Sequence, residues 1–106
     1  MVMNKKDRAI AEAVKSAVRE FDPSAEVVLF GSRARGDARQ DSDYDFLVLL
    51  NVPLDFVLKE KILDRLYLIE LSTENVISPL IRSKTDWVRM TAYPIHQEIS
   101  AYGIAI

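Results

Sequence analysis

Apolar and polar positions follow two different patterns along this chain. Over residues 4–20 the apolar positions recur every three or four residues, as they do on one face of a helix. The same spacing returns over residues 54–72, which predicts a second, longer helix. Short apolar runs at 26–30, 43–50 and 74–83 are bounded by turn residues instead, which is typical of buried strands.

Shorter helices complete the predicted order. One occupies residues 32–35, one follows Thr85 as its cap, and one spans residues 95–102. Helices and strands therefore alternate, which favours a small α/β sheet of three core strands with helices against it. The strand at 43–50 is expected in the middle, and the tail at 104–106 is expected either to extend the sheet or to pack on a partner.

Two segments allow more than one interpretation. The end of the long helix, residues 66–69, is apolar nearly all round, so it lies either deep in the core or at an interface. Among the aromatic residues, Trp87, Tyr93 and Tyr102 are expected in the core or at an interface. His96, at the start of a helix, is expected to cap it or to lie on the surface.

Amino-acid composition limits the number of domains, the binding partners and the location that can be expected. With 106 residues, 49% of them hydrophobic, the chain is expected to fold as one domain over residues 1–106. The net charge of −2 argues against direct nucleic-acid binding, for which a basic domain would be expected. The chain has no cysteine, no recognisable signal peptide and no apolar run long enough to span a membrane. A cytoplasmic location is the expectation.

Two aspartates stand where the 43–50 strand begins. Residues two apart in a strand point to the same side, so Asp43 and Asp45 share a face at the edge of the core. Two adjacent carboxylates repel each other unless a cation lies between them. A polar turn would explain Asp41 but not Asp45, and Phe46 stands where an EF-hand needs glycine. The pair therefore predicts a Mg²⁺ site, with Mn²⁺ as the alternative metal.

A phosphate-binding turn is predicted just before this strand. Gly31 allows close approach of a ligand, and Ser32 lies near the N-cap of the short helix that follows. The free N–H groups of a helix N-terminus suit a phosphate, and Arg33 and Arg35 are candidates to pair with its oxygens. The full Walker A pattern is absent, because Asp37 stands in place of its lysine.

These residues form a recognisable signature. Gly31-Ser32, then Arg35-Gly36, then Ser42-Asp43-x-Asp45 before an apolar run resembles the motif of the polymerase-β-like nucleotidyltransferases, particularly their minimal, MNT-type members. The resemblance implies a mixed sheet and transfer of a nucleoside monophosphate, with AMP from ATP as the expected donor, to an acceptor hydroxyl. It also implies that Gly31, Ser32 and Arg35 bind or shape the nucleotide site, and that Asp43 and Asp45 are catalytic metal ligands.

The chain departs from the family at one point. Active members commonly carry a third carboxylate on a neighbouring strand, whereas residues 75–83 contain no acid. Glu74, just before that run, is the only nearby candidate for a third metal ligand. Without such a ligand, nucleotide binding remains possible but turnover is in question.

Two functional hypotheses follow. Minimal members of the family often stand beside a HEPN-type protein, and some act as antitoxins by adenylylating a tyrosine of that toxin. The resemblance therefore implies such a toxin as partner and an antitoxin role. The alternative is a module that retains the nucleotide site but neutralises its partner by contact alone. Assembly with further copies of the same chain is left open.

Overall fold

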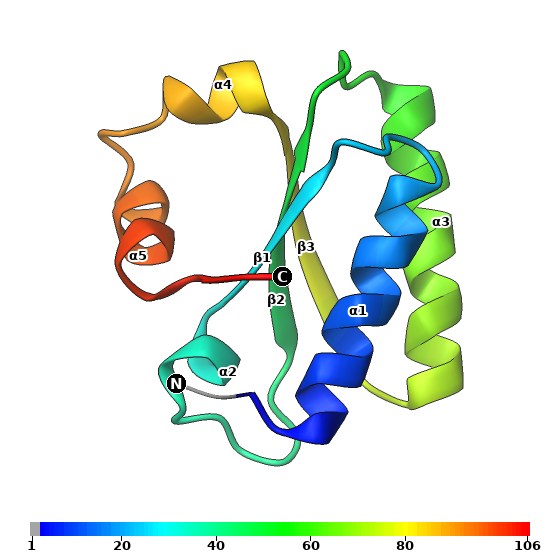
Figure 1. Cartoon of the computed structure of the whole chain (residues 1–106), viewed down its shortest axis with the longest axis vertical. Helices are drawn as coiled ribbons and strands as arrows, with labels where there is room; N and C mark the ends of the chain where they lie inside the picture. Colours follow the sequence, from blue (N-terminus) through cyan, green and yellow to red (C-terminus); the bar gives the residue numbers. More distant parts are fainter. Residues whose placement is uncertain (1–2) are drawn as a thin grey trace.

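A four-stranded sheet runs through the middle of the molecule, and helices cover both of its faces (Figure 1). The computed structural model describes residues 3–106. The strands lie in the order β3-β2-β1-β4; they are β1 (Glu26–Phe30), β2 (Tyr44–Leu50), β3 (Ile77–Ser83) and β4 (Ile104–Ala105). β1 is antiparallel to both β2 and β4, whereas β3 is parallel to β2. The mixed sheet that the resemblance implied is therefore confirmed.

The strand count differs by one from the prediction of three. The C-terminal tail forms β4, in which Ile104 pairs with Leu29 and Ala105 with Val28. Of the two alternatives for the tail, extension of the sheet is the one observed. β2 still lies inside the sheet, and β3 lies at one edge, where Pro79 lacks an amide hydrogen that an inner strand would need.

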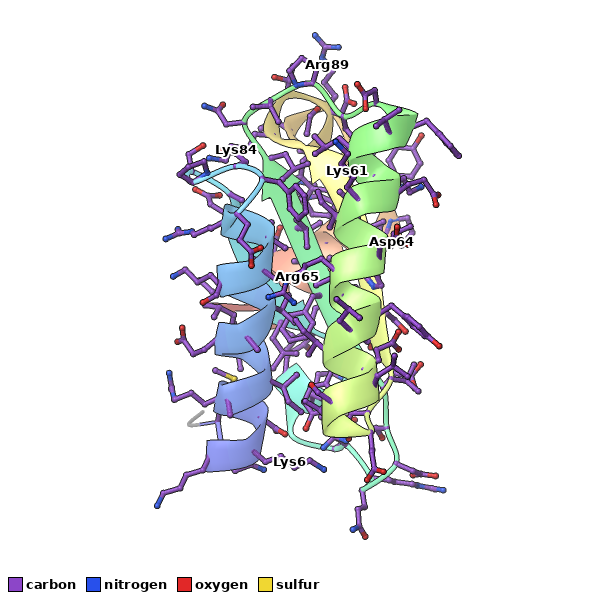
Figure 2. The ribbon with its side chains drawn as sticks, turned by 90° about the vertical axis from the view of Figure 1, so that its right-hand side faces the viewer. Lys6, Lys61, Asp64, Arg65, Lys84 and Arg89 are labelled. Carbon is purple, nitrogen blue, oxygen red and sulfur yellow. The ribbon has the colours of Figure 1, made fainter. Side chains whose placement is uncertain are left out.

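Two long helices, α1 (Lys5–Arg19) and α3 (Phe56–Thr73), lie side by side over one face of the sheet (Figure 2). Their predicted stripes are the buried ones. α1 buries Ile10, Val14, Ala17 and Val18, and α3 buries Ile62, Leu66 and Ile69. Where the helices meet the solvent, Arg65 of α3 reaches toward α1 and lies 3.1 Å from a carboxylate oxygen of Glu20. Burial of these stripes, at about 25 cal/mol per Å² of apolar surface, is the main force that holds this layer.

The C-terminal half of α3 is only partly covered. Leu66 and Ile69 are buried, but Tyr67, Leu68 and Leu71 are each more than half exposed. Of the two alternatives for residues 66–69, a position deep in the core is wrong for Tyr67 and Leu68. The alternative, an interface, stays a prediction.

The opposite face carries a smaller core beneath α4 (Lys84–Val88) and α5 (Pro94–Tyr102). Its buried members are Leu47, Leu49, Trp87 and Ile99. Trp87 also stacks on His96, with 4.5 Å between ring centroids, whereas Tyr93 and Tyr102 are exposed. The helix α4 is not capped by Thr85 as predicted. Ser83 is its cap, and its hydroxyl accepts a hydrogen bond from the amide of Asp86 at 3.1 Å.

No helix within residues 3–106 is long and apolar enough to cross a membrane. The longest, α3, carries a lysine or an acid in most of its turns, beginning with Lys59 and Glu60. It begins at Phe56, two residues later than predicted, because the side chain of Asp55 accepts a hydrogen bond from the amide of Leu58 and so caps it.

Candidate functional site

The predicted phosphate-binding turn lies beyond the end of β1, at the lower edge of the sheet in Figure 1. It consists of Gly31 and the one-turn helix α2 (Ser32–Arg35), and we call residues 31–35 the phosphate turn. Gly31, not Ser32, is the N-cap residue, with φ of 74° and ψ of −155°. Glycine adopts this conformation without steric cost, so the chain turns one residue earlier than predicted. Ser32 is the first residue of the helix and is partly exposed.

A second constraint acts on Gly31. A β-carbon at this position would overlap the Oδ2 atom of Asp45 and would lie 3.1 Å from its Cγ atom. The contact follows from the sheet register, because Phe30 pairs with Asp45 and the next residue is Gly31. The phosphate turn and the second aspartate are therefore in direct contact.

Asp43 and Asp45, which we call the acid pair, lie at the start of β2. Asp43 immediately precedes the strand and is exposed, while Asp45 is its second residue and is half-buried. Burial raises the pKa of the Asp45 carboxyl, and the charge of Asp43 raises it further, with partial relief from Arg35. A cation beside the pair would reverse both effects, since it stabilises the ionised carboxylates.

Ser78 of β3 faces the acid pair. It is in register with Asp45 across the parallel pairing of β2 and β3, and its hydroxyl donates a hydrogen bond to Asp43 Oδ2 at 3.2 Å. The strand residue that lies nearest the pair is therefore a serine, not a carboxylate. Sequence reasoning missed it because the parallel register of β3, which starts at Ile77 and not at Glu74, was not known.

Glu74 does not gather with the acid pair into a cluster of three acidic side chains among the described residues. It ends α3 in a left-handed conformation, with φ of 57° and ψ of 33°, and lines an open hollow of about 790 Å³. The hollow is bounded by Lys6, Arg39, Gln40, Asp41, Ser42, Thr73, Glu74, Asn75 and Val76. Within residues 3–106, no three acidic, histidine or cysteine side chains gather closely enough to hold a metal ion. The structure thus leaves Glu74 apart from the acid pair.

The two predicted phosphate-pairing arginines point to different places. Arg35 lies at the surface, where its Nη1 is 2.7 Å from Glu98 Oε1 and its Nε is 3.4 Å from Asp37 Oδ2. These bonds raise its pKa, the one to Glu98 most. Arg33 is buried instead and donates to backbone carbonyls, so the prediction that it presents its guanidinium to a phosphate does not fit its position.

The acid pair suits one metal in particular. Mg²⁺ in proteins is commonly held by one or two carboxylates, with water and substrate phosphate oxygens as its other ligands. Asp43 and Asp45 supply two carboxylates on one side, and the phosphate turn adjoins them. The donor set therefore fits Mg²⁺ bound together with a nucleotide, and Mn²⁺ prefers similar ligands.

Comparison with known proteins agrees with this arrangement. The family model described as a nucleotidyltransferase domain matches residues 11–99, which include both the phosphate turn and the acid pair. MJ0141 of Methanocaldococcus jannaschii is 39% identical over 80 residues, or 76% of this chain and 76% of its own. MntA of Haemophilus influenzae is 35% identical over 49 residues, or 46% of this chain and 43% of its own. Both relatives are provisionally named protein adenylyltransferases.

Solved structures share the fold. A chain of a toxin–antitoxin complex with AMP-PNP has a TM-score of 0.64 and 19% identity, and the match covers 90% of this chain and 70% of that one. A chain from the complex of the tri-AMPylated Shewanella oneidensis HEPN toxin with its MNT antitoxin has a TM-score of 0.61 and 15% identity, with 93% and 70% covered. From the family match and the identity to MJ0141, this chain belongs to the nucleotidyltransferase domain family and is a nucleotidyltransferase.

Proposed function

We propose that this nucleotidyltransferase transfers AMP from ATP to a protein hydroxyl group in the presence of Mg²⁺, and that the acceptor is a tyrosine of a HEPN-type toxin. One observation carries the proposal. The contact between Gly31 and Asp45 joins a turn suited to phosphate with carboxylates suited to a metal. A nucleoside triphosphate with its Mg²⁺ needs both of these at one place.

In this proposal each part of the site has one task. The Ser32 hydroxyl and the first N–H groups of α2 hold the β- and γ-phosphate oxygens. Asp43 and Asp45 hold Mg²⁺, which neutralises charge on the phosphates when it is bound. Arg35 is the last residue of the phosphate turn, and its guanidinium pairs with Asp37 in the following loop and with Glu98 of α5. When ATP binds, Arg35 exchanges Glu98 for a phosphate oxygen.

The chemistry is an in-line displacement. The acceptor oxygen forms a bond to the α-phosphorus, the bond from that phosphorus to the bridging oxygen breaks, and pyrophosphate leaves with the electron pair. The hydroxyl proton passes to water, because within residues 3–106 no third carboxylate adjoins the acid pair. We therefore expect slow turnover, since general-base catalysis typically contributes 10²- to 10⁴-fold.

The acceptor is proposed from the relatives. Two of them are provisionally named protein adenylyltransferases, and an MNT antitoxin of the same fold was solved with a tri-AMPylated HEPN toxin. A second function, neutralisation of a toxin by contact alone, is favoured by one observation. Ser78, which contacts Asp43 from the neighbouring strand, is not a carboxylate.

The experiment incubates the protein with Mg²⁺, a HEPN-type protein and α-labelled ATP, GTP, CTP or UTP in turn, and follows label on the toxin. Transfer from ATP to a tyrosine, located by mass spectrometry and lost in Asp43→Asn/Asp45→Asn, supports the proposal. Label from another nucleotide would correct the donor. If no label transfers and the double variant still neutralises the toxin, contact alone is the function and the enzymatic proposal is wrong.

A further inference from the structure

A buried polar cluster lies directly behind the acid pair and is built from three elements. Asp7 comes from α1, Arg33 from α2, and Tyr44 from β2. The Tyr44 hydroxyl donates a hydrogen bond to Asp7 Oδ1, and the Arg33 guanidinium carbon lies 4.2 Å above the centre of the Tyr44 ring. Arg33 Nη1 is 3.7 Å from the same Asp7 oxygen. The three side chains therefore form one connected set.

The cluster also reaches the loop that leads into the acid pair. Arg33 Nη2 donates to the carbonyl oxygen of Ser42 at 2.8 Å and to that of Gln40 at 3.2 Å. The Ser42 carbonyl belongs to the peptide bond that joins Ser42 to Asp43. Arg33 itself follows Ser32 in the phosphate turn. One side chain thus ties the phosphate turn to the backbone of the first aspartate.

Tyr44 extends the same connection to the second aspartate. It stands between Asp43 and Asp45 and is fully buried on the other face of β2. Burial, together with the bond to Asp7, raises its pKa to about 12, so its hydroxyl remains a donor at neutral pH. With its ring beneath Arg33 and its hydroxyl on Asp7, Tyr44 has little freedom to rotate or shift. Its two neighbours in sequence, Asp43 and Asp45, therefore have little freedom as well.

As a source of stability alone, this buried polar cluster is less effective than apolar packing would be. Only 8% of the Arg33 side chain is exposed, and its Nε atom meets no acceptor within residues 3–106. Buried ion pairs pay a large desolvation cost, and well-packed apolar residues of similar volume are often at least as stabilising. The directional bonds of a guanidinium fix geometry in a way that apolar packing does not.

We infer that Arg33 is a positioning residue, which sets the separation of the phosphate turn from Asp43 through the Ser42 carbonyl and holds Tyr44 through its ring. This inference rests on the proposed function, since it concerns how the nucleotide and metal sites are aligned for it. The inference assigns a positioning role to Arg33, which the sequence alone made a candidate phosphate ligand. Asp7 supports the role by holding the Tyr44 hydroxyl and balancing the charge of Arg33.

The test compares Arg33→Met and Arg33→Lys with wild type, using Arg65→Met as the matched control. Arg65 also pairs with an acid, Glu20, but on the outer side of α1 and α3 (Figure 2). Mn²⁺ affinity is measured in the presence of a non-hydrolysable ATP analogue, by electron paramagnetic resonance and without turnover. The kinetic constants kcat and KM for nucleotide transfer and the melting temperature are measured as well.

We expect both Arg33 variants to bind Mn²⁺ with the analogue about tenfold more weakly, and kcat to fall about 10- to 100-fold, as small misplacements of reacting groups do. KM for ATP should rise by up to about the same factor as the loss of Mn²⁺ affinity, because metal and nucleotide bind together, and Arg65→Met should match wild type. A purely structural role predicts a lower melting temperature with wild-type Mn²⁺ affinity at temperatures where the variant is folded, and that result overturns the inference.

Other outcomes of this experiment separate a failure of the inference from a failure of the proposed function. If Arg33→Met does not fold, Arg33→Lys decides, because it keeps the charge and most of the stem but loses the two-carbonyl geometry. If wild type transfers no nucleotide, the proposed function is wrong, but the Mn²⁺ comparison still tests the position of Arg33. Equal Mn²⁺ affinity of wild type and both variants, or no Mn²⁺ binding by wild type, contradicts the inference.

Discussion

The α-carbon of Gly31 lies against the carboxylate of Asp45 so closely that no side chain fits between them. This contact joins the two halves of the nucleotidyltransferase signature, which are separated in sequence by the loop over residues 36–42. A single sheet register produces it, since the last residue of β1 pairs with Asp45. Any change that separates the two residues should therefore affect nucleotide and metal binding together.

Gly31→Ala tests this contact. The added methyl group meets Asp45, and φ of 74° is strained for alanine, so we expect a loss of about 1–3 kcal/mol in the free energy of unfolding. Urea denaturation measures the loss, and titration with ATP and Mg²⁺ should show binding at least tenfold weaker. The same substitution made in an Asp45→Ala background separates the two causes. Only the backbone strain remains there, so an equal loss in both backgrounds would contradict a contact with Asp45.

Asp45→Asn tests the raised pKa of this carboxyl. The folded-state pKa lies above the unfolded value, so the folded state holds the proton more tightly. The resulting stability is fully present below the unfolded pKa and is lost as pH rises through the folded pKa. At pH 7 without metal the ionised Asp45 thus lowers stability, and the asparagine variant should melt roughly 2–4 °C higher, a modest gain because solvent screens a half-buried group.

Thermal melts in EDTA from pH 3.5 to 7 measure this difference. The melting temperatures of wild type and Asp45→Asn should converge toward low pH and diverge as Asp45 ionises. Added Mg²⁺ with ATP should stabilise wild type and leave the variant unchanged. A variant that melts below wild type at pH 7 in EDTA would show that the ionised carboxylate is not a source of instability.

Local pattern predicted much of this fold. Most apolar positions in the helical stripes of α1 and α3 are buried or partly buried, and the apolar run of β2, bounded by turn residues, placed the acid pair at a strand end. These features depend only on neighbouring residues and on which side of an element is apolar. The resemblance to the family added the mixed sheet, which no local pattern could show.

Long-range pairing explains what was missed. The two residues of β4 pair with the open edge of β1, so the local pattern could offer extension of the sheet only as one of two alternatives for the tail. Asp7 lies in the first turn of α1 and is buried, because Tyr44 and Arg33 from distant parts of the chain satisfy its carboxylate. Ser78 meets the acid pair only through the parallel register of β3. None of these partners is visible from periodicity.

Arg35→Met and Glu98→Gln together test whether Arg35 binds the nucleotide. Arg35 pairs with Glu98 across α2 and α5, at the surface, so loss of the pair should change the stability of the fold little. If Arg35 contacts the triphosphate, Arg35→Met should weaken ATP binding about tenfold, whereas Glu98→Gln should leave it equal or tighter. Calorimetric titration of ATP measures both. Equal weakening in the two variants would instead indicate that the ion pair positions α2 and that Arg35 does not touch phosphate.

Ser78→Asp tests whether the missing third carboxylate limits turnover. The side chain at this position already contacts Asp43, so an aspartate here places a third negative charge beside the acid pair. Without metal, repulsion among the three should lower the melting temperature, and divalent cations should restore it. We expect metal affinity to rise about tenfold, and transfer to accelerate if the new carboxylate also accepts the acceptor proton. Measurements of kcat against Mg²⁺ concentration follow both effects.

Ser78→Ala is the control for that experiment, because it removes the hydrogen bond to Asp43 without adding charge. It should leave metal affinity within about fivefold of wild type, since a typical hydrogen bond contributes roughly 1 kcal/mol after hydration is counted. If Ser78→Asp binds Mg²⁺ no better than Ser78→Ala, then position 78 does not face the metal. The two-carboxylate site would then be complete as it stands, and slow turnover would need another cause.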